Sequence, residues 1–236
     1  MRELVTGLNW DEMLRGGPAY DRLTYRRKQD RRDFQAAVEM GANGGLTLPR
    51  GIDAGHPIGL LLNRLTLPYG SIKSFDELPI PFRCVATDME KAEPVVLKDG
   101  SLSEALRATM AIPGVFTPVE MNGRILADGG LLDNVPVDVL KDMGADIIIA
   151  VDVGTPLGDR KSLQSLLGIV GQSIGVATIQ SVRNSLRQAD IVLSPDLGQH
   201  TSIDYPASAE IVSLGYSGAQ KKAQILKSLA VDDAAW

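Results

Sequence analysis

From residue 82 onward, short apolar runs rich in valine and isoleucine recur along the chain. They predict strands at 82–89, 95–97, 125–127, 146–153 and 191–193. The run at 147–151 is continuously apolar, which is typical of a strand that is covered on both faces. Segments of helical character separate these runs. Alternation of strands and helices predicts an α/β protein with a mainly parallel sheet.

Local signals place the helices between the strands. Ser101 followed by Glu104 is the capping-box pattern, and it predicts a helix that reaches about residue 111. Pro113 and Gly114 end that helix. A second helix is predicted at 136–143.

The chain divides by character into three stretches, which we interpret as one domain covering 1–236. Residues 1–70 form an irregular, partly helical connecting part, 71–198 the α/β core, and 199–236 the C-terminal helices. The first stretch holds glycine-rich loops and an apolar helix-like run, at 41–45, 51–55 and 58–67.

Composition narrows the possible functions. The chain is 44% hydrophobic and 22% charged, and its net charge of −5 gives no reason to expect a nucleic-acid partner. A basic cluster at 26–32 is interpreted as a solvated surface rather than a contact with anionic lipid. Two histidines and the single Cys84 are too few for a typical zinc site, so no metal is expected. No apolar run approaches the ~18 residues that span a bilayer.

Asp128 is the strongest candidate for chemistry. It directly follows the predicted strand 125–127 and precedes Gly129 and Gly130. In open α/β sheets, functional residues lie just beyond the carboxyl ends of strands, and the glycines allow a sharp turn and a close approach. The spacing alone supports equally a general base and a structural turn aspartate that holds backbone amides.

The segment 75–154 resembles the bacterial branch of the patatin-like phospholipases. The matching pieces, in order, are Leu-Pro-Ile-Pro-Phe at 78–82, Ala-Thr-Asp at 86–88, the helix and its proline at 105–113, Asp-Gly-Gly at 128–130, Asn-Val-Pro at 134–136, and the strand at 144–154. Residues 194–198 continue the resemblance. Their order and spacing carry it, because each piece alone is unspecific.

The resemblance implies a three-layer α/β/α fold and hydrolysis of acyl esters in phospholipids or related lipids. It also implies a Ser–Asp dyad in which Asp128 is the base, Gly129 and Gly130 form its turn, and neither histidine nor cofactor takes part. A lipid substrate is the implied partner, with contact to a membrane surface. The related bacterial branch includes exported proteins.

One departure from the family pattern is decisive. No G-x-S-x-G segment and no glycine-rich loop after a strand precede Asp128. We therefore expect a domain that is incomplete at its N-terminus, has no nucleophile of its own, exposes apolar sheet surface and is inactive alone. A catalytically inactive lipid- or partner-binding remnant is the alternative.

A second alternative is an α/β-hydrolase that uses Ser173. Gly171, Ser173 and Gly175 spell G-x-S-x-G, and Asp196 and His200 follow in the order of a triad. Apolar residues at helical spacing nevertheless run through this region, at 163, 166, 167, 170, 174, 182 and 186. We therefore predict that Ser173 lies within a helix. Asp88 and Asp152, at two other strand ends, are predicted to bond nearby backbone amides.

Overall fold

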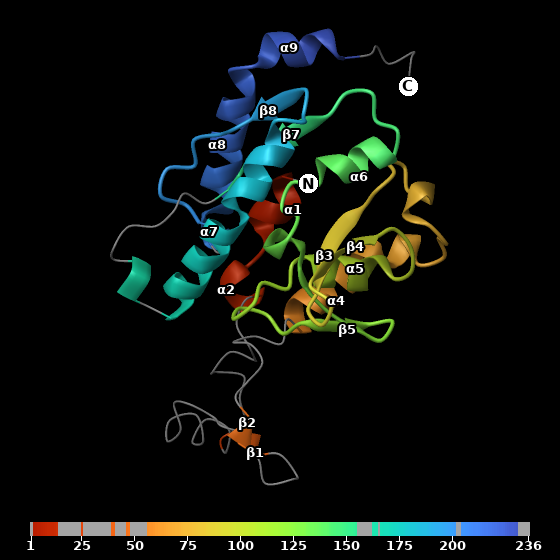
Figure 1. The fold of residues 1–236 in the computed structure, drawn as a ribbon, viewed down its shortest axis with the longest axis vertical. Coiled ribbons are helices and arrows are strands. Elements are labelled where there is room, and N and C mark those ends of the chain that lie inside the picture. The colour runs from red at the N-terminus through yellow and green to blue at the C-terminus, as the bar shows by residue number, and fades with distance from the viewer. Residues whose placement is uncertain are drawn as a thin grey trace. The chain divides into compact units, whose positions relative to one another are not determined.

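A computed structural model describes the chain at residues 2–13, 25, 39–40, 46–47, 56–154, 162–164, 166–201 and 204–230 (Figure 1). The chain divides into two compact units, one formed by Met1–Leu8 with Val135–Trp236 and the other by Asn9–Asn134. The predicted loops at 41–45 and 51–55 and the basic cluster at 26–32 lie outside the described residues.

A four-stranded sheet forms the centre of the unit Asn9–Asn134. Its strands are β3 (Cys84–Asp88), β4 (Glu93–Leu97), β5 (Val119–Met121) and β6 (Arg124–Asp128). The order is β4-β3-β6-β5, and every neighbouring pair is antiparallel. All five residues of β3 are buried. The predicted α/β class is confirmed, but a mainly parallel central sheet is not.

Short connections explain the antiparallel pairing. Asn122 and Gly123 alone join β5 to β6, with φ of 52° and 71°. Two central residues with positive φ form the hairpin turn whose twist matches that of paired strands. Four residues join β3 to β4, and one of them, Ala92, also has a positive φ of 54°. A parallel pair would require a longer crossover.

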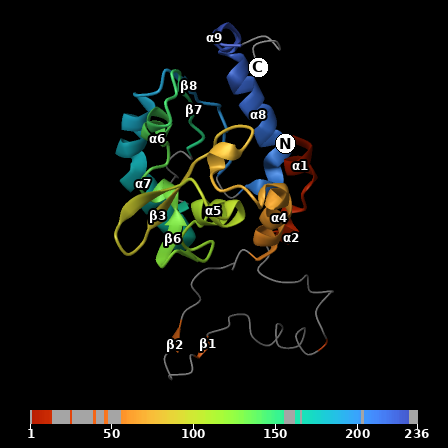
Figure 2. The same ribbon diagram turned by 90° about the vertical axis from the view of Figure 1, so that its right-hand side faces the viewer.

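Helices cover one face of this sheet. In α5 (Leu102–Thr109) the Ser101 hydroxyl accepts from the Glu104 N–H, as the sequence predicts. Ala105 and Ala108 face the strands and are fully buried. They share a core with Phe75, Cys84, Ala86, Leu97 and Leu126. The predicted apolar helix is present as α4 (His56–Thr66), which contacts α5 and, at its other side, the short α2 (Trp10–Met13) (Figure 2). Elsewhere in this unit, β1 (Glu39–Met40) pairs antiparallel with β2 (Leu46–Thr47).

The unit of Met1–Leu8 and Val135–Trp236 contains a parallel pair of strands. Here β7 (Ile149–Val151) pairs with β8 (Ile191–Leu193), not with the sheet of the other unit. The helices of this unit are α1 (Arg2–Gly7), α6 (Val137–Asp142), α7 (Leu166–Leu186), α8 (Ser208–Gln220) and α9 (Ala223–Ser228). Helix α1 packs on α8, where the Ser208 hydroxyl donates to the Val5 carbonyl.

Strand β7 differs from its prediction in one respect. The sequence predicts that the run 147–151 is covered on both faces, but only two alternate residues of it, Ile148 and Ala150, are buried. The neighbours that point the other way, Ile147, Ile149 and Val151, are each exposed by 41% or more. One face of this strand is therefore apolar and exposed among the described residues.

Candidate active site

Asp128 ends β6 at the point where the chain leaves the sheet. Its backbone N–H donates to the Ala111 carbonyl at 3.0 Å. Its carbonyl accepts from the Thr87 hydroxyl at 2.9 Å. Strand β3 lies beside it in register, with Ala86 opposite Asp128. The backbone of Asp128 is therefore held both by the neighbouring strand and by the segment that follows α5.

The carboxylate of Asp128 is half-buried at this turn. Its Oδ1 accepts from the Gly130 N–H at 2.7 Å. Burial raises the pKa of Asp128 above its usual value, and the hydrogen bond from Gly130 opposes that rise. Within the described part of the chain, this is the one hydrogen bond that the carboxylate makes, and no described residue donates to Oδ2.

At each glycine of the turn, a different steric conflict excludes a side chain. A Cβ on Gly129 would overlap the Val85 carbonyl oxygen and lie 2.7 Å from the carbonyl carbon. A Cβ on Gly130 would lie 2.9 Å from Oδ1 of both Asp128 and Asn134. The first conflict is with backbone atoms of a central strand, which cannot move aside as a side chain can. The predicted glycine turn is therefore required by packing.

Asp88 makes the backbone bonds that the sequence predicts. It is 1% exposed, and its Oδ1 accepts from the N–H groups of Glu90 and Lys91 at 3.0 and 3.1 Å. Burial raises its pKa, but these two bonds and the charge of Arg124, 3.8 Å away, outweigh it and hold the pKa below its usual value. Asp88 thus stabilises the β3–β4 turn.

Two further aspartates serve as turn residues. Asp152 Oδ1 accepts from the Gly154 N–H at 3.1 Å, as predicted. Asp196 Oδ1 accepts from the Gly198 N–H at 3.1 Å in the same way. In both, the side chain bonds a backbone amide two residues ahead, which is a common aspartate turn.

Ser173 does not lie on a strand-to-helix turn. It lies inside α7, is exposed, and donates to the Ile169 carbonyl one turn earlier at 2.8 Å. His200 lies 3.5 Å from the Glu210 carboxylate, and His56 begins α4 with an exposed side chain. The prediction that the G-x-S-x-G letters fall within a helix is confirmed. The α/β-hydrolase alternative loses the strand that it requires before Ser173.

Sequence reasoning missed three residues around the turn. The Thr87 hydroxyl holds the carbonyl of Asp128, and the Thr109 hydroxyl donates to the Val85 carbonyl, which also packs against Gly129. Asn134 precedes α6, which begins at Val137 without a side-chain cap, and the Asn134 amide oxygen lies over Gly130. Both threonines lie in pieces that resemble the family, but no local pattern reveals their role, because it depends on strand register.

Comparison with known families places this turn in a recognised domain. The patatin-like phospholipase family matches residues 17–141, more than half of the chain and including the Asp128 turn. The chain belongs to the patatin-like phospholipase family.

Several relatives are similar over part of the chain. An uncharacterized NTE family protein of Mycobacterium tuberculosis is 45% identical over 92 residues, which cover 39% of this chain and 26% of the relative. The mouse patatin-like phospholipase domain-containing proteins 7 and 6 are 29% identical over 171 residues and 30% over 160. These matches cover 61% and 65% of this chain but 13% and 11% of the relatives. The chain thus matches about a quarter or less of each relative's length.

Within the described segments, no helix is long and apolar enough to cross a membrane. The same segments hold no cluster of three or more potential metal ligands.

Proposed function

We propose that this chain supplies the general base, Asp128, of a lipid acyl ester hydrolase that uses a Ser–Asp dyad. The observation that carries the proposal is the hydrogen bonding of the two carboxylate oxygens of Asp128. One oxygen is fixed by the Gly130 N–H, while the other has no hydrogen-bond donor among the described residues. A carboxylate fixed in this way is oriented and still able to accept a proton.

The chemistry follows from that geometry. Oδ2 accepts the proton of a serine hydroxyl as the serine oxygen attacks the acyl carbonyl, and the proton then passes to the departing alcohol. Water cleaves the resulting acyl-enzyme with the same carboxylate as base. The raised pKa makes Asp128 a stronger base than an exposed aspartate. No imidazole is needed, and the contacts described for the Asp128 carboxylate include none.

The proposal places the nucleophilic serine outside these 236 residues. No G-x-S-x-G precedes Asp128, and the only such letters surround Ser173 inside α7. We therefore propose that the chain alone turns over no ester. The three-layer arrangement with a mainly parallel sheet is proposed for the domain on family grounds, and the parallel pair of β7 and β8 supports it.

The test is kinetic and uses the natural gene product that contains these residues. Asp128→Asn is expected to lower kcat for p-nitrophenyl esters at least ~10²-fold with little change in KM, because the amide keeps the turn but takes no proton. Asp196→Asn is the matched control, since Asp196 accepts from the amide two residues ahead in the same way but is exposed. Equal activity of Asp128→Asn and wild type would refute the dyad.

A non-catalytic lipid- or partner-binding role is the alternative. It requires that the natural gene product itself show no turnover that depends on Asp128. The same assay therefore separates the two proposals.

A further inference from the structure

A short apolar loop projects from the unit Asn9–Asn134 immediately before β3. Its residues are Leu78, Pro79, Ile80, Pro81 and Phe82. The three at the tip are all exposed, and Ile80 is exposed by 71%. A single exposed aliphatic residue is ordinary on a protein surface. This loop is distinguished by the contacts that fix its base.

Both ends of the loop are fixed to one buried acceptor. The N–H groups of Leu78 and Phe82 donate to the carbonyl of Phe75, at 3.4 and 3.2 Å. Phe75 is fully buried, and its ring centroid lies 6.2 Å from that of Phe82. The loop is therefore closed at its base and fixed to the hydrophobic core.

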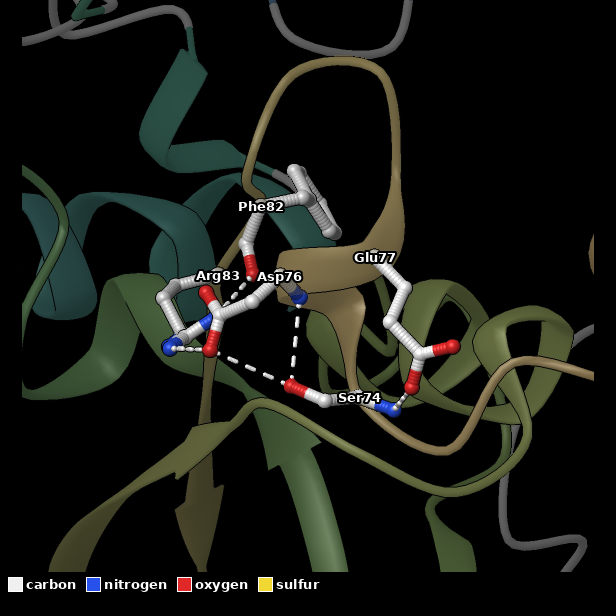
Figure 3. A network of polar contacts seen from close by, with 5 residues as sticks. All are labelled: Ser74, Asp76, Glu77, Phe82 and Arg83. Atoms are coloured by element: carbon white, nitrogen blue, oxygen red, sulfur yellow. Dashed lines mark hydrogen bonds and ion pairs between the residues drawn. The ribbon is translucent and has the colours of Figure 1, made fainter.

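A polar network also holds the base of the loop (Figure 3). The Arg83 guanidinium contacts both carboxylate oxygens of Asp76 at 2.8 Å and donates to the Phe82 carbonyl at 2.8 Å. Ser74 and Glu77 form a reciprocal capping box around the short helix that contains Asp76. The two prolines restrict the tip itself, because each fixes its own φ.

The backbone of the loop carries few unsatisfied donors. Pro79 and Pro81 have no N–H, and the N–H groups of Leu78 and Phe82 are bonded to Phe75. Of the five loop residues, this leaves the N–H of Ile80. An unbonded N–H or carbonyl is costly wherever water is excluded, so the Ile80 side chain enters the apolar phase while the loop backbone stays at the hydrated surface.

We propose that the loop 78–82 is a lipid-contact site, with Ile80 inserted into the surface of a membrane or lipid aggregate. The inference rests on the proposed function, because it names the part of the hydrolase that contacts the lipid surface containing its substrate. A rigid loop loses little conformational entropy on insertion, and burial of an isoleucine side chain favours partition into the apolar phase.

The charges at the base of the loop specify the kind of lipid surface. Arg83 is paired with Asp76, and the other exposed groups nearby include both Lys73 and Glu77. With no excess of positive charge, the loop gains nothing from anionic headgroups. The contact is therefore apolar, it suits electrically neutral lipids, and it is insensitive to salt.

A lipid surface fits this loop better than a protein partner does. A specific protein interface requires about 800 Å² on each side. The apolar tip consists of one isoleucine between two prolines, and exposed Asp76 and Glu77 lie at its base. Burial of a single exposed side chain, by contrast, already favours partition into an apolar phase.

Vesicle partition tests the proposal with the chain itself. Binding to phosphatidylcholine vesicles is measured by co-sedimentation for wild type, Ile80→Ser and Ile225→Ser. Ile225 is the matched control, because it is 50% exposed but lies in helix α9. The partition coefficient is expected to fall about tenfold or more in Ile80→Ser, with little change in the control and none on addition of salt. Wild type that does not bind, or equal partition of Ile80→Ser and wild type, would overturn the proposal.

Two additional measurements distinguish the lipid contact from a protein contact and from the dyad. Self-association that disappears in Ile80→Ser, seen by light scattering without lipid, would reassign the loop to a protein contact. In the natural gene product, Ile80→Ser is expected to lower hydrolysis of vesicle substrate but not of a dissolved p-nitrophenyl ester, whereas Asp128→Asn lowers both. Failure of the lipid contact is thereby distinguished from failure of the dyad.

Discussion

The backbone of Gly129 lies directly against the carbonyl group of Val85, although 44 residues separate the two positions along the chain. The contact forms where β6 ends beside the central strand β3. It fixes the level at which the chain turns away from the sheet, and hence the position of Asp128, one residue earlier. The glycine thus determines the geometry of the candidate active site as well as permitting the turn.

Gly129→Ala is therefore expected to destabilise the chain. The added methyl group meets backbone atoms, so either the turn or β3 must shift, at a cost of about 1–3 kcal/mol or more. Gly59→Ala is the control: Gly59 lies within α4, no atom lies within 4 Å of the place that an added methyl group would take, and alanine favours helix by about 0.5–1 kcal/mol. Urea unfolding measures both. Equal stability of Gly129→Ala and wild type would show that the contact is not tight.

Ser173 and the two histidines are expected to be dispensable. Ser173→Ala removes an exposed hydroxyl that bonds only within its own helix, so stability should change by no more than about 0.5 kcal/mol. Joint replacement of His56 and His200 by glutamine should leave most of the ester hydrolysis of the natural gene product. Loss of turnover in either variant, together with retained turnover in Asp128→Asn, would favour a triad over the dyad.

Thr87 is expected to act as a positioning residue for Asp128. Its hydroxyl donates to the Asp128 carbonyl from a side chain that is 4% exposed. Thr87→Val keeps the shape but removes this donor, which should lower the free energy of unfolding by about 1 kcal/mol.

The kinetic effect of Thr87→Val should be intermediate. With the turn less well fixed, we expect kcat of the natural gene product to fall about tenfold, below the ~10²-fold loss for Asp128→Asn. Thr87→Ser keeps the hydroxyl and should recover most of kcat, even though it loses a buried methyl group. If serine and valine reduced kcat equally, packing rather than the hydrogen bond would position Asp128.

Local signals predicted those parts of the fold that depend on neighbours in sequence. The hydroxyl of Ser101 caps α5, and the apolar spacing around Ser173 correctly indicated a helix. Asp128 was placed at the end of a strand because apolar residues precede it and glycines follow. In each case the interaction that decides the structure spans only a few residues, so the sequence displays it directly.

Pairing between strands was less predictable. The Asn122 and Gly123 pair is a hairpin signal, and it indicates the antiparallel β5–β6 turn that the prediction of a mainly parallel sheet overlooked. The contact of Gly129 with Val85 depends on the register of β3 against β6. Register reflects burial and turn geometry summed over whole strands, so no local pattern reveals which carbonyl faces Gly129.

The pH dependence of stability provides a test of the environment of Asp128. Burial raises its pKa in the folded chain, with the Gly130 hydrogen bond opposing only part of the rise. An acid with a higher pKa in the folded than in the unfolded state binds protons more tightly when folded, so its ionisation opposes folding. The free energy of unfolding should therefore fall as the pH rises from about 3.9, the usual aspartate value, through the raised folded value.

Asp128→Asn should remove this penalty, because asparagine keeps an oxygen that accepts from the Gly130 N–H but does not ionise. The variant is expected to be more stable than wild type at neutral pH, and the difference should shrink as the pH falls below about 3.9, where the wild-type carboxyl is protonated in both states. Urea unfolding between about pH 3 and pH 8 measures the difference, with exposed Asp196→Asn as a control that should show little pH-dependent gain. Suppose instead that the stability of Asp128→Asn relative to wild type increased as the pH fell. Asp128 would then have a lowered pKa in the folded chain, which would indicate a charged partner for its carboxylate rather than a buried base.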